Sequence, residues 1–201
     1  MVGGPLLFVL ALFARKLAED LALRGVPKSF DKRPANIYLL LDVSGSMEGG
    51  KLSGAKEASE SFLAQIDDKQ DHVGLIAFSG EVKEVYPLGP ADKPALVSSI
   101  QGLEAVGTTA LYGAVIHAIE RLQQLASPER RNVIVAMTDG QNTEDNHSLE
   151  DIGSKVSEAD TPVSIFTVAY GYGADMKVLR QIAQWGHGQA YKANRRTIRT
   201  L

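Results

Sequence analysis

The feature that most constrains the fold of this chain is an alternation that begins at residue 36. Short apolar runs alternate with longer segments in which apolar residues recur every three or four positions. Continuous apolar runs are typical of strands buried on both faces of a parallel sheet. The expected strands are 37–41, 72–78, 81–88, 132–137, 163–169 and 190–192.

The segments between these runs have the spacing of helices that bury one face. In the first of them, Leu52, Ala55, Ala58, Phe62 and Ile66 predict an amphipathic helix over residues 51–66. The other expected helices start near residue 94 or cover residues 111–125, 149–159 and 176–185. Strands that alternate with helices in this way favour a parallel sheet covered on both faces.

One strand departs from this pattern. Residues 81–88 alternate in character and follow Ser79-Gly80 directly, which predicts a hairpin with the preceding strand at the edge of the sheet. The fold class expected from the whole pattern is α/β. It is a three-layer α/β/α, Rossmann-like sandwich with a mostly parallel central sheet and one short antiparallel edge strand.

The domain boundary is expected near Pro34, where the polar stretch 28–33 gives way to the first strand. We therefore divide the chain into an N-terminal helical extension, residues 1–35, and one domain, residues 36–201. The apolar run 5–14 in the extension is too short to span a bilayer. Residues 6–23 are expected to form an amphipathic helix that packs on the domain. The alternative is a remnant of a membrane-proximal segment.

Charge and cysteine content exclude several classes of function. The formal net charge is -3, which argues against the basic stripe that nucleic-acid binding requires, so no nucleic-acid partner is expected. The chain contains no cysteine, which excludes disulfides, thiolate zinc sites and cysteine nucleophiles.

Oxygen-bearing side chains follow several of the expected strands. Asp42 ends the first strand, Ser44 and Ser46 follow it, and Asp139 comes at the end of the strand 132–137. Thr109 lies in a loop that opens a helix. Parallel strands deliver their carboxyl ends to one edge of the sheet, so we expect these five side chains to converge there.

Carboxylate and hydroxyl oxygens suit a hard divalent cation, Mg²⁺, Mn²⁺ or Ca²⁺, and disfavour zinc or copper. A site with only two carboxylates leaves the charge of such an ion partly uncompensated. The ion would then accept a further carboxylate from outside.

Three segments resemble the metal-ion-dependent adhesion site of von Willebrand factor type A domains: Asp42-Val-Ser-Gly-Ser-Met47, Gly107-Thr-Thr-Ala-Leu-Tyr112 and Thr138-Asp-Gly140. The resemblance covers residues 36–201. It implies that Ser44, Ser46 and Thr109 contact the metal directly. It also implies that Asp42 and Asp139 act mostly through water, and that a Glu or Asp of a protein partner completes the shell.

The same resemblance implies a protein-binding module and not an enzyme. The family usually has two glycines before the threonine ligand, whereas Thr108 replaces the second glycine here. Met47, Thr108 and Gln141 each adjoin an expected ligand, and we predict that they form the rim that contacts the partner. Such modules, some of them bacterial, occur in surface proteins and as partners of ATP-driven assemblies, so either setting is compatible with the sequence.

The alternative function uses the same loop. Residues 45–51 match the G-x-x-x-x-G-K pattern of a phosphate-binding loop, which would make the chain a nucleotide hydrolase. However, Leu52 stands where that motif needs a Ser or Thr. A metal-dependent phosphotransfer enzyme with Asp42 as nucleophile is also conceivable, but Ser44 replaces the expected second carboxylate.

Overall fold

The computed structural model of the chain describes residues 33–125, 127–143, 145–171 and 173–193. These residues contain a six-stranded sheet with the strand order β3-β2-β1-β4-β5-β6. The strands are β1 (Ala35–Asp42), β2 (His72–Phe78), β3 (Val82–Pro90), β4 (Arg131–Thr138), β5 (Val163–Tyr170) and β6 (Ala190–Ala193). All neighbouring strands run parallel except β2 and β3, so the predicted mixed sheet is confirmed.

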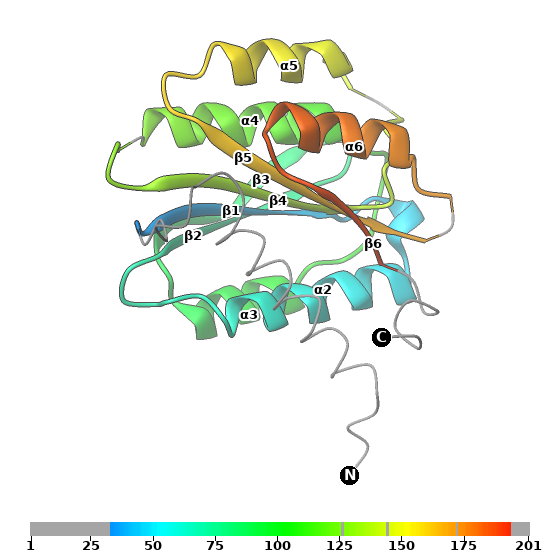
Figure 1. Cartoon of the computed structure of the whole chain (residues 1–201). Helices are drawn as coiled ribbons and strands as arrows, with labels where there is room; N and C mark the ends of the chain where they lie inside the picture. Colours follow the sequence, from blue (N-terminus) through cyan, green and yellow to red (C-terminus); the bar gives the residue numbers. More distant parts are fainter. Residues whose placement is uncertain (1–32, 126, 144, 172, 194–201) are drawn as a thin grey trace.

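Helices cover both faces of this sheet, which confirms the three-layer prediction (Figure 1). They are α2 (Gly50–Leu63), α3 (Lys93–Gln101), α4 (Leu111–Gln124), α5 (Leu149–Ser157) and α6 (Met176–Trp185). In Figure 1, α2 and α3 lie on one face of the sheet and α4, α5 and α6 on the other.

Strand β1 lies at the centre of the sheet and is buried along its whole length. Successive side chains of a strand point to opposite faces. Leu39 and Leu41 therefore pack in the core beneath α2 and α3, whereas Tyr38 and Leu40 pack in the core beneath the other helices. Burial on both faces explains why this strand appears in the sequence as an unbroken apolar run.

The antiparallel edge strand β3 is nine residues long, which is longer than the sequence predicted. Its pairing with β2 shifts register between Val73 and Leu75 and again between Leu75 and Ile76. Irregular pairing of this kind twists an edge strand and interrupts its ladder, which protects an exposed sheet edge. The first helix also differs from expectation, because α2 ends at Leu63 and a tight turn follows, in which Ile66 N–H donates to the Leu63 carbonyl.

The predicted N-terminal helix over residues 6–23 lies outside the described residues, and the division of the chain at residue 35 stays a prediction. Strand β1 begins at Ala35, directly after Pro34. Within the part of the chain that the structure describes, no helix combines the length and apolar character needed to cross a bilayer.

The chain leaves the carboxyl edge of the sheet in opposite directions from its two central strands. After β1 it enters α2 on one face, and after β4 it continues to α5 on the other face (Figure 1). Between two such strands an open α/β sheet forms a crevice at its carboxyl edge, which is where ligands bind in this architecture. A ligand site is therefore expected at the carboxyl ends of β1 and β4.

Candidate functional site

Asp42 is the last residue of β1 and is fully buried. Its two carboxylate oxygens are both held by hydrogen bonds: the Ser44 N–H donates to Oδ1 at 2.9 Å, and the Thr138 hydroxyl donates to Oδ2 at 2.6 Å. These bonds come from the loop after β1 and from the end of β4. They fix the carboxylate in the crevice between the two strands.

Burial raises the pKa of the Asp42 carboxyl above its ordinary value, and the neighbouring Asp139 carboxylate adds a smaller increase. The hydrogen bonds from Ser44 and Thr138 act in the opposite direction. The ionised form of Asp42 is thus short of compensating charge in this environment. A cation placed beside it would stabilise that form.

Ser44 and Ser46 flank the start of a 3₁₀ turn, η1 (Gly45–Met47). Their hydroxyl oxygens lie 3.1 Å apart. Neighbouring ligands in an octahedral shell of radius about 2.1 Å are about 3.0 Å apart, so this pair matches one edge of a Mg²⁺ coordination shell. Ser44 is buried, whereas Ser46 is exposed, so the pair connects the buried carboxylates to the surface.

Asp139 follows directly after β4 and is 2% exposed. Gly140, the next residue, has a φ of 78°, a conformation that glycine adopts without strain. It lets the chain turn away at once, so that Asp139 stays beside Asp42. The ammonium group of Lys51, at the start of α2, lies 2.9 Å from Asp139 Oδ2.

Backbone hydrogen bonds join the loop that carries Thr109 to the other loops. The Gly45 N–H donates to the Gly107 carbonyl at 2.9 Å, and the Thr143 N–H donates to the Thr109 carbonyl at 3.0 Å. In return, the Thr109 N–H donates to the Thr143 hydroxyl at 2.9 Å. Thr109 itself is 2% exposed. The structure thus brings the loops that carry the five predicted ligands to one edge of the sheet.

The three predicted rim residues have different environments. Thr108 and Gln141 are exposed, and the Thr108 hydroxyl lies close to Gly80 in the β2–β3 hairpin. The prediction for Met47 is wrong, because its side chain is fully buried. The 3₁₀ turn directs this side chain into the core beneath α2, so Met47 supports the loop from below and does not contact a partner.

The geometry also bears on the phosphate-loop alternative. The segment that would have to form an open phosphate cradle contains the 3₁₀ turn η1, and Lys51 pairs with Asp139. Leu52, where that motif needs a hydroxyl, packs in the core at 7% exposure. These contacts favour a cation site over a phosphate cradle.

The donor set combines carboxylates with hydroxyls. Within the described ranges, no group of three or more His, Cys, Asp or Glu side chains is placed to hold a metal. A cation at this edge would have two carboxylates and neighbouring hydroxyls as its donors, and oxygen donors suit a hard cation.

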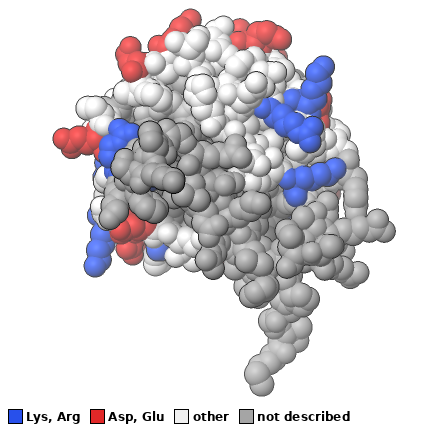
Figure 2. Space-filling model, viewed as in Figure 1, with Lys and Arg blue, Asp and Glu red and all other residues white. Residues whose placement is uncertain are grey.

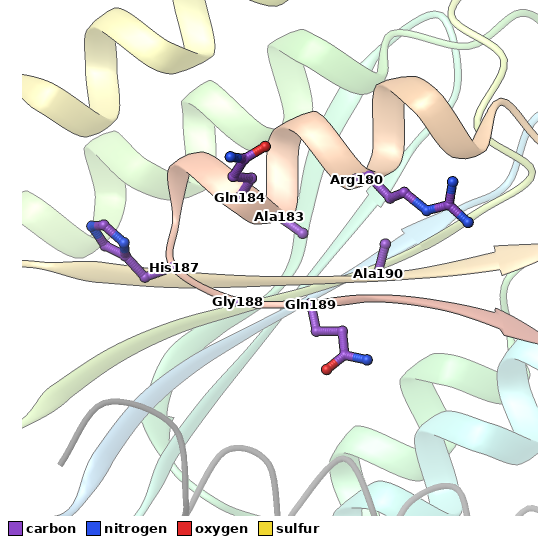
Figure 3. A pocket seen from close by; sticks show the side chains of 7 residues that line it. All are labelled: Arg180, Ala183, Gln184, His187, Gly188, Gln189 and Ala190. Carbon is purple, nitrogen blue, oxygen red and sulfur yellow. The ribbon is translucent and has the colours of Figure 1, made fainter. Parts of the chain in front are cut away.

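A surface hollow of about 470 Å³ lies elsewhere, between α6 and the start of β6. Figure 3 shows that its side chains do not point to a common centre: Arg180 and Gln184 project from the helix, while His187 and Gln189 point in other directions. The hollow also lies at the far edge of the sheet from β1. It does not form part of the candidate site.

Sequence reasoning missed two contributors to this site. Thr138 orients Asp42 across the two central strands, and Lys51 pairs with Asp139. Thr138 could have been found from its position at the end of the strand before Asp139. Lys51 has a visible signal in the sequence, but only as the lysine of the alternative phosphate loop, which does not predict a contact with Asp139.

Known proteins resemble most of this chain in sequence. The human inter-alpha-trypsin inhibitor heavy chain H2 is 27% identical over 176 residues, which cover 83% of this chain and 18% of that protein. The human heavy chain H4 is 28% identical over 167 residues, covering 78% of this chain and 18% of that protein. The chain thus spans about a fifth of the length of these curated relatives.

Solved structures share the fold. The von Willebrand factor type A structure from Catenulispora acidiphila matches with a TM-score of 0.71 at 23% identity, over 82% of this chain and 40% of that one. Proximal thread matrix protein 1 from the mussel byssus, in a structure with a zinc-occupied MIDAS motif, has a TM-score of 0.68 at 20% identity, over 81% of this chain and 44% of that one. Residues 36–198 match the family model of the von Willebrand factor type A domain, and the chain belongs to this family.

Proposed function

We propose that this domain binds one divalent cation, Mg²⁺ or alternatively Mn²⁺ or Ca²⁺, at the carboxyl ends of β1 and β4. The bound ion then coordinates an Asp or Glu side chain of a protein partner. The ligands in this proposal are Asp42, Ser44, Ser46, Thr109 and Asp139. The domain would act as a metal-dependent module for adhesion or complex assembly and not as an enzyme.

The observation that carries the proposal is the Ser44–Ser46 hydroxyl pair beside two buried carboxylates. The 3.1 Å separation suits neighbouring ligands of one small cation, and Asp42 and Asp139 are both at most 2% exposed. Asp42 is fully buried, and burial of an ionised carboxylate carries a high desolvation cost. A divalent ion would remove part of that cost.

The mussel protein supports a metal at this motif, because its MIDAS motif holds zinc. For this chain we favour Mg²⁺ over zinc, since the proposed ligands are all oxygens and include no histidine or cysteine. The charges of the two carboxylates, of Lys51 beside Asp139 and of a divalent ion would sum to +1, which an outside carboxylate would neutralise.

The partner is a separate part of the proposal. Thr108 and Gln141 are exposed, and each adjoins a proposed ligand in sequence. In this proposal they contact the protein that presents the carboxylate. A surface ligand and a subunit of an ATP-driven assembly both fit this description. Figure 2 shows described side chains of both charges on the face in view. The formal net charge of -3 fits a protein partner better than nucleic acid.

Calorimetric titration with MgCl₂ and MnCl₂ tests the metal step on the natural protein and on Asp42→Ala. We expect saturable binding of one ion by the natural protein and none by the variant, with circular dichroism to show that the variant is folded. Absence of binding by the natural protein would refute the proposal.

Two further measurements test the remaining steps. A pull-down in MgCl₂ and in a chelator should recover partner proteins only with the metal, and an added excess of acetate should weaken that capture. An ATP hydrolysis assay with Lys51→Ala as the comparison tests the alternative function. Saturable hydrolysis that requires Lys51 would favour the nucleotide hydrolase.

A further inference from the structure

The ion pair between Lys51 and Asp139 is the feature of the site that the proposed function does not use. Its partners differ in burial, because the Lys51 side chain is 37% exposed and that of Asp139 is 2% exposed. A second lysine pair has the same N–O distance of 2.9 Å but lies on the surface: Lys155 is 40% exposed and Glu120 is 46% exposed. Lys51 therefore supplies positive charge to a buried carboxylate, whereas Lys155 does not.

The end of the Lys51 side chain also passes close to a neighbouring loop. Gly171, just after β5, has a φ of 87° and lies beside the aliphatic part of this side chain. A Cβ atom at residue 171 would lie only 2.9 Å from Lys51 Cε and 3.5 Å from its Nζ. A glycine at this position leaves room for the lysine. The path of the side chain toward Asp139 is thus shaped by a neighbouring loop.

A divalent cation and this ammonium group would share one carboxylate. Asp139 Oδ2 accepts from Lys51, and Oδ1 accepts at most a long contact of 3.5 Å from the Gln141 N–H. Two positive groups on one carboxylate repel each other, and the repulsion is strong where one partner is buried. Binding of the ion must either displace the ammonium from Asp139 or proceed against its charge.

We infer that Lys51 is an internal competitor of the metal: its ammonium group neutralises Asp139 and lowers the affinity of the site for divalent cations. The inference rests on the proposed function, because it concerns the same site. Its consequence is regulatory. The ion, and with it the partner, would bind only at higher metal concentration and would be released more readily than from a site without the lysine.

The opposite role is also physically possible and gives the opposite result. If Lys51 served mainly to orient Asp139 toward the ion, its removal would weaken metal binding, as removal of an outer-shell partner does. The sign of the change in metal affinity therefore separates competition from orientation.

The test compares Lys51→Met with the natural protein by calorimetric titration of MgCl₂ and MnCl₂. Methionine keeps an unbranched apolar side chain and removes the charge. We expect Lys51→Met to bind the ions more tightly, because the competing positive charge is removed. The gain should be limited to roughly tenfold, because the ammonium of the natural protein is partly exposed and solvent screens part of its charge. Lys51→Arg keeps the charge and should bind like the natural protein. Lys155→Met is the matched control and should change the affinity less than about twofold.

Thermal unfolding provides a second readout. In a chelator, Lys51→Met should unfold at a lower temperature than the natural protein, because Asp139 loses its counter-charge. In excess MgCl₂ the gain in unfolding temperature should be larger for Lys51→Met than for the natural protein. Lys155→Met should show neither change.

The possible outcomes separate the inference from the proposed function. Tighter binding by Lys51→Met than by the natural protein supports the inference. Binding by this variant alone would refute the proposed function of the natural protein, and the inference with it. If the natural protein binds the ion and Lys51→Met binds it equally or more weakly, the inference is wrong and the proposed function stands. If neither protein binds any of the ions, both are wrong.

Discussion

Both edges of the sheet contain buried polar side chains, but these are arranged differently. At the amino edge, Asn36 donates to Asn132, and Asn132 donates to the Thr161 hydroxyl at 2.9 Å. Gln123, from the end of α4, accepts from the Thr161 N–H and donates to its carbonyl. All of these groups are neutral amides and hydroxyls that pair with one another.

At the carboxyl edge the groups are charged and acceptors dominate. Asp42 and Asp139 are as buried as Asn36 and Asn132, all four at 3% exposure or less. The two carboxylates bring two negative charges. Among the described residues, Lys51 lies in contact with Asp139 and brings a single positive charge. Burial alone therefore does not mark a binding site. The imbalance of charge and acceptors distinguishes the carboxyl edge, and the amino edge serves stability.

The largest effect is expected for Asp139→Asn, which removes one of the two negative charges at the carboxyl edge. We expect the affinity for Mg²⁺ to fall by roughly 100-fold or more, because the ion loses a charged partner in a buried site. Calorimetric titration measures the change. An affinity within a few-fold of the natural protein would show that the charge imbalance does not create the site.

The next effect is expected at the amino edge. Asn132→Ala removes the centre of the neutral network: Asn36 loses its acceptor, and the Thr161 hydroxyl keeps only its bond to Gln123. We expect the free energy of unfolding to fall by about 2 kcal/mol, because buried polar groups lose hydrogen bonds. Urea denaturation measures this loss. Metal affinity should stay within about twofold, and a large change in it would contradict the division of roles between the edges.

A smaller effect, which is a gain in stability and not a loss, is expected for Asp42→Asn. In a chelator this variant should be more stable than the natural protein by about 1 kcal/mol, because a buried charge at a binding site is replaced by a neutral group. The amide can still accept from the Ser44 N–H. Urea denaturation in a chelator measures the gain, and a loss of stability in the variant would contradict the interpretation.

The pH dependence follows from the same residue. Burial raises the pKa of Asp42 in the folded chain, so the unfolded chain loses this proton at lower pH than the folded chain does. The contribution of Asp42 to the stability of the metal-free natural protein therefore declines as pH rises from about 3.9, the ordinary Asp value, through the folded pKa. The gain in stability of Asp42→Asn over the natural protein should be small below this pH range and should reach its full size above it.

The smallest effect is expected for Thr108→Gly, which restores the residue that the family usually has at this position. Thr108 is exposed and its hydroxyl lies near Gly80. We expect stability to change by less than about 0.5 kcal/mol and metal affinity by less than about twofold. A substantial gain in metal affinity would show that Thr108 constrains the threonine beside it.

The sequence alone predicted much of this architecture because its signals are local. The apolar run before Asp42 and the helical spacing from Leu52 to Phe62 each reflect which side of an element is buried. Parallel strands also bring their carboxyl ends to one edge, so the meeting of Asp42 with Asp139 could be predicted without coordinates. The tight turn after Leu63 lacked such a signal, because Ile66 continues the helical spacing beyond the end of the helix.

The direction of individual side chains was decided only by tertiary structure. Met47 adjoins a proposed ligand in sequence, yet the 3₁₀ turn buries it. Lys51 and Asp139 are 88 positions apart, and their contact depends on how α2 packs beside β4 and on the space left by Gly171. Periodicity and strand order determine which loops meet. The packing of distant elements determines which side chains within those loops touch, since such contacts leave no local pattern in the chain.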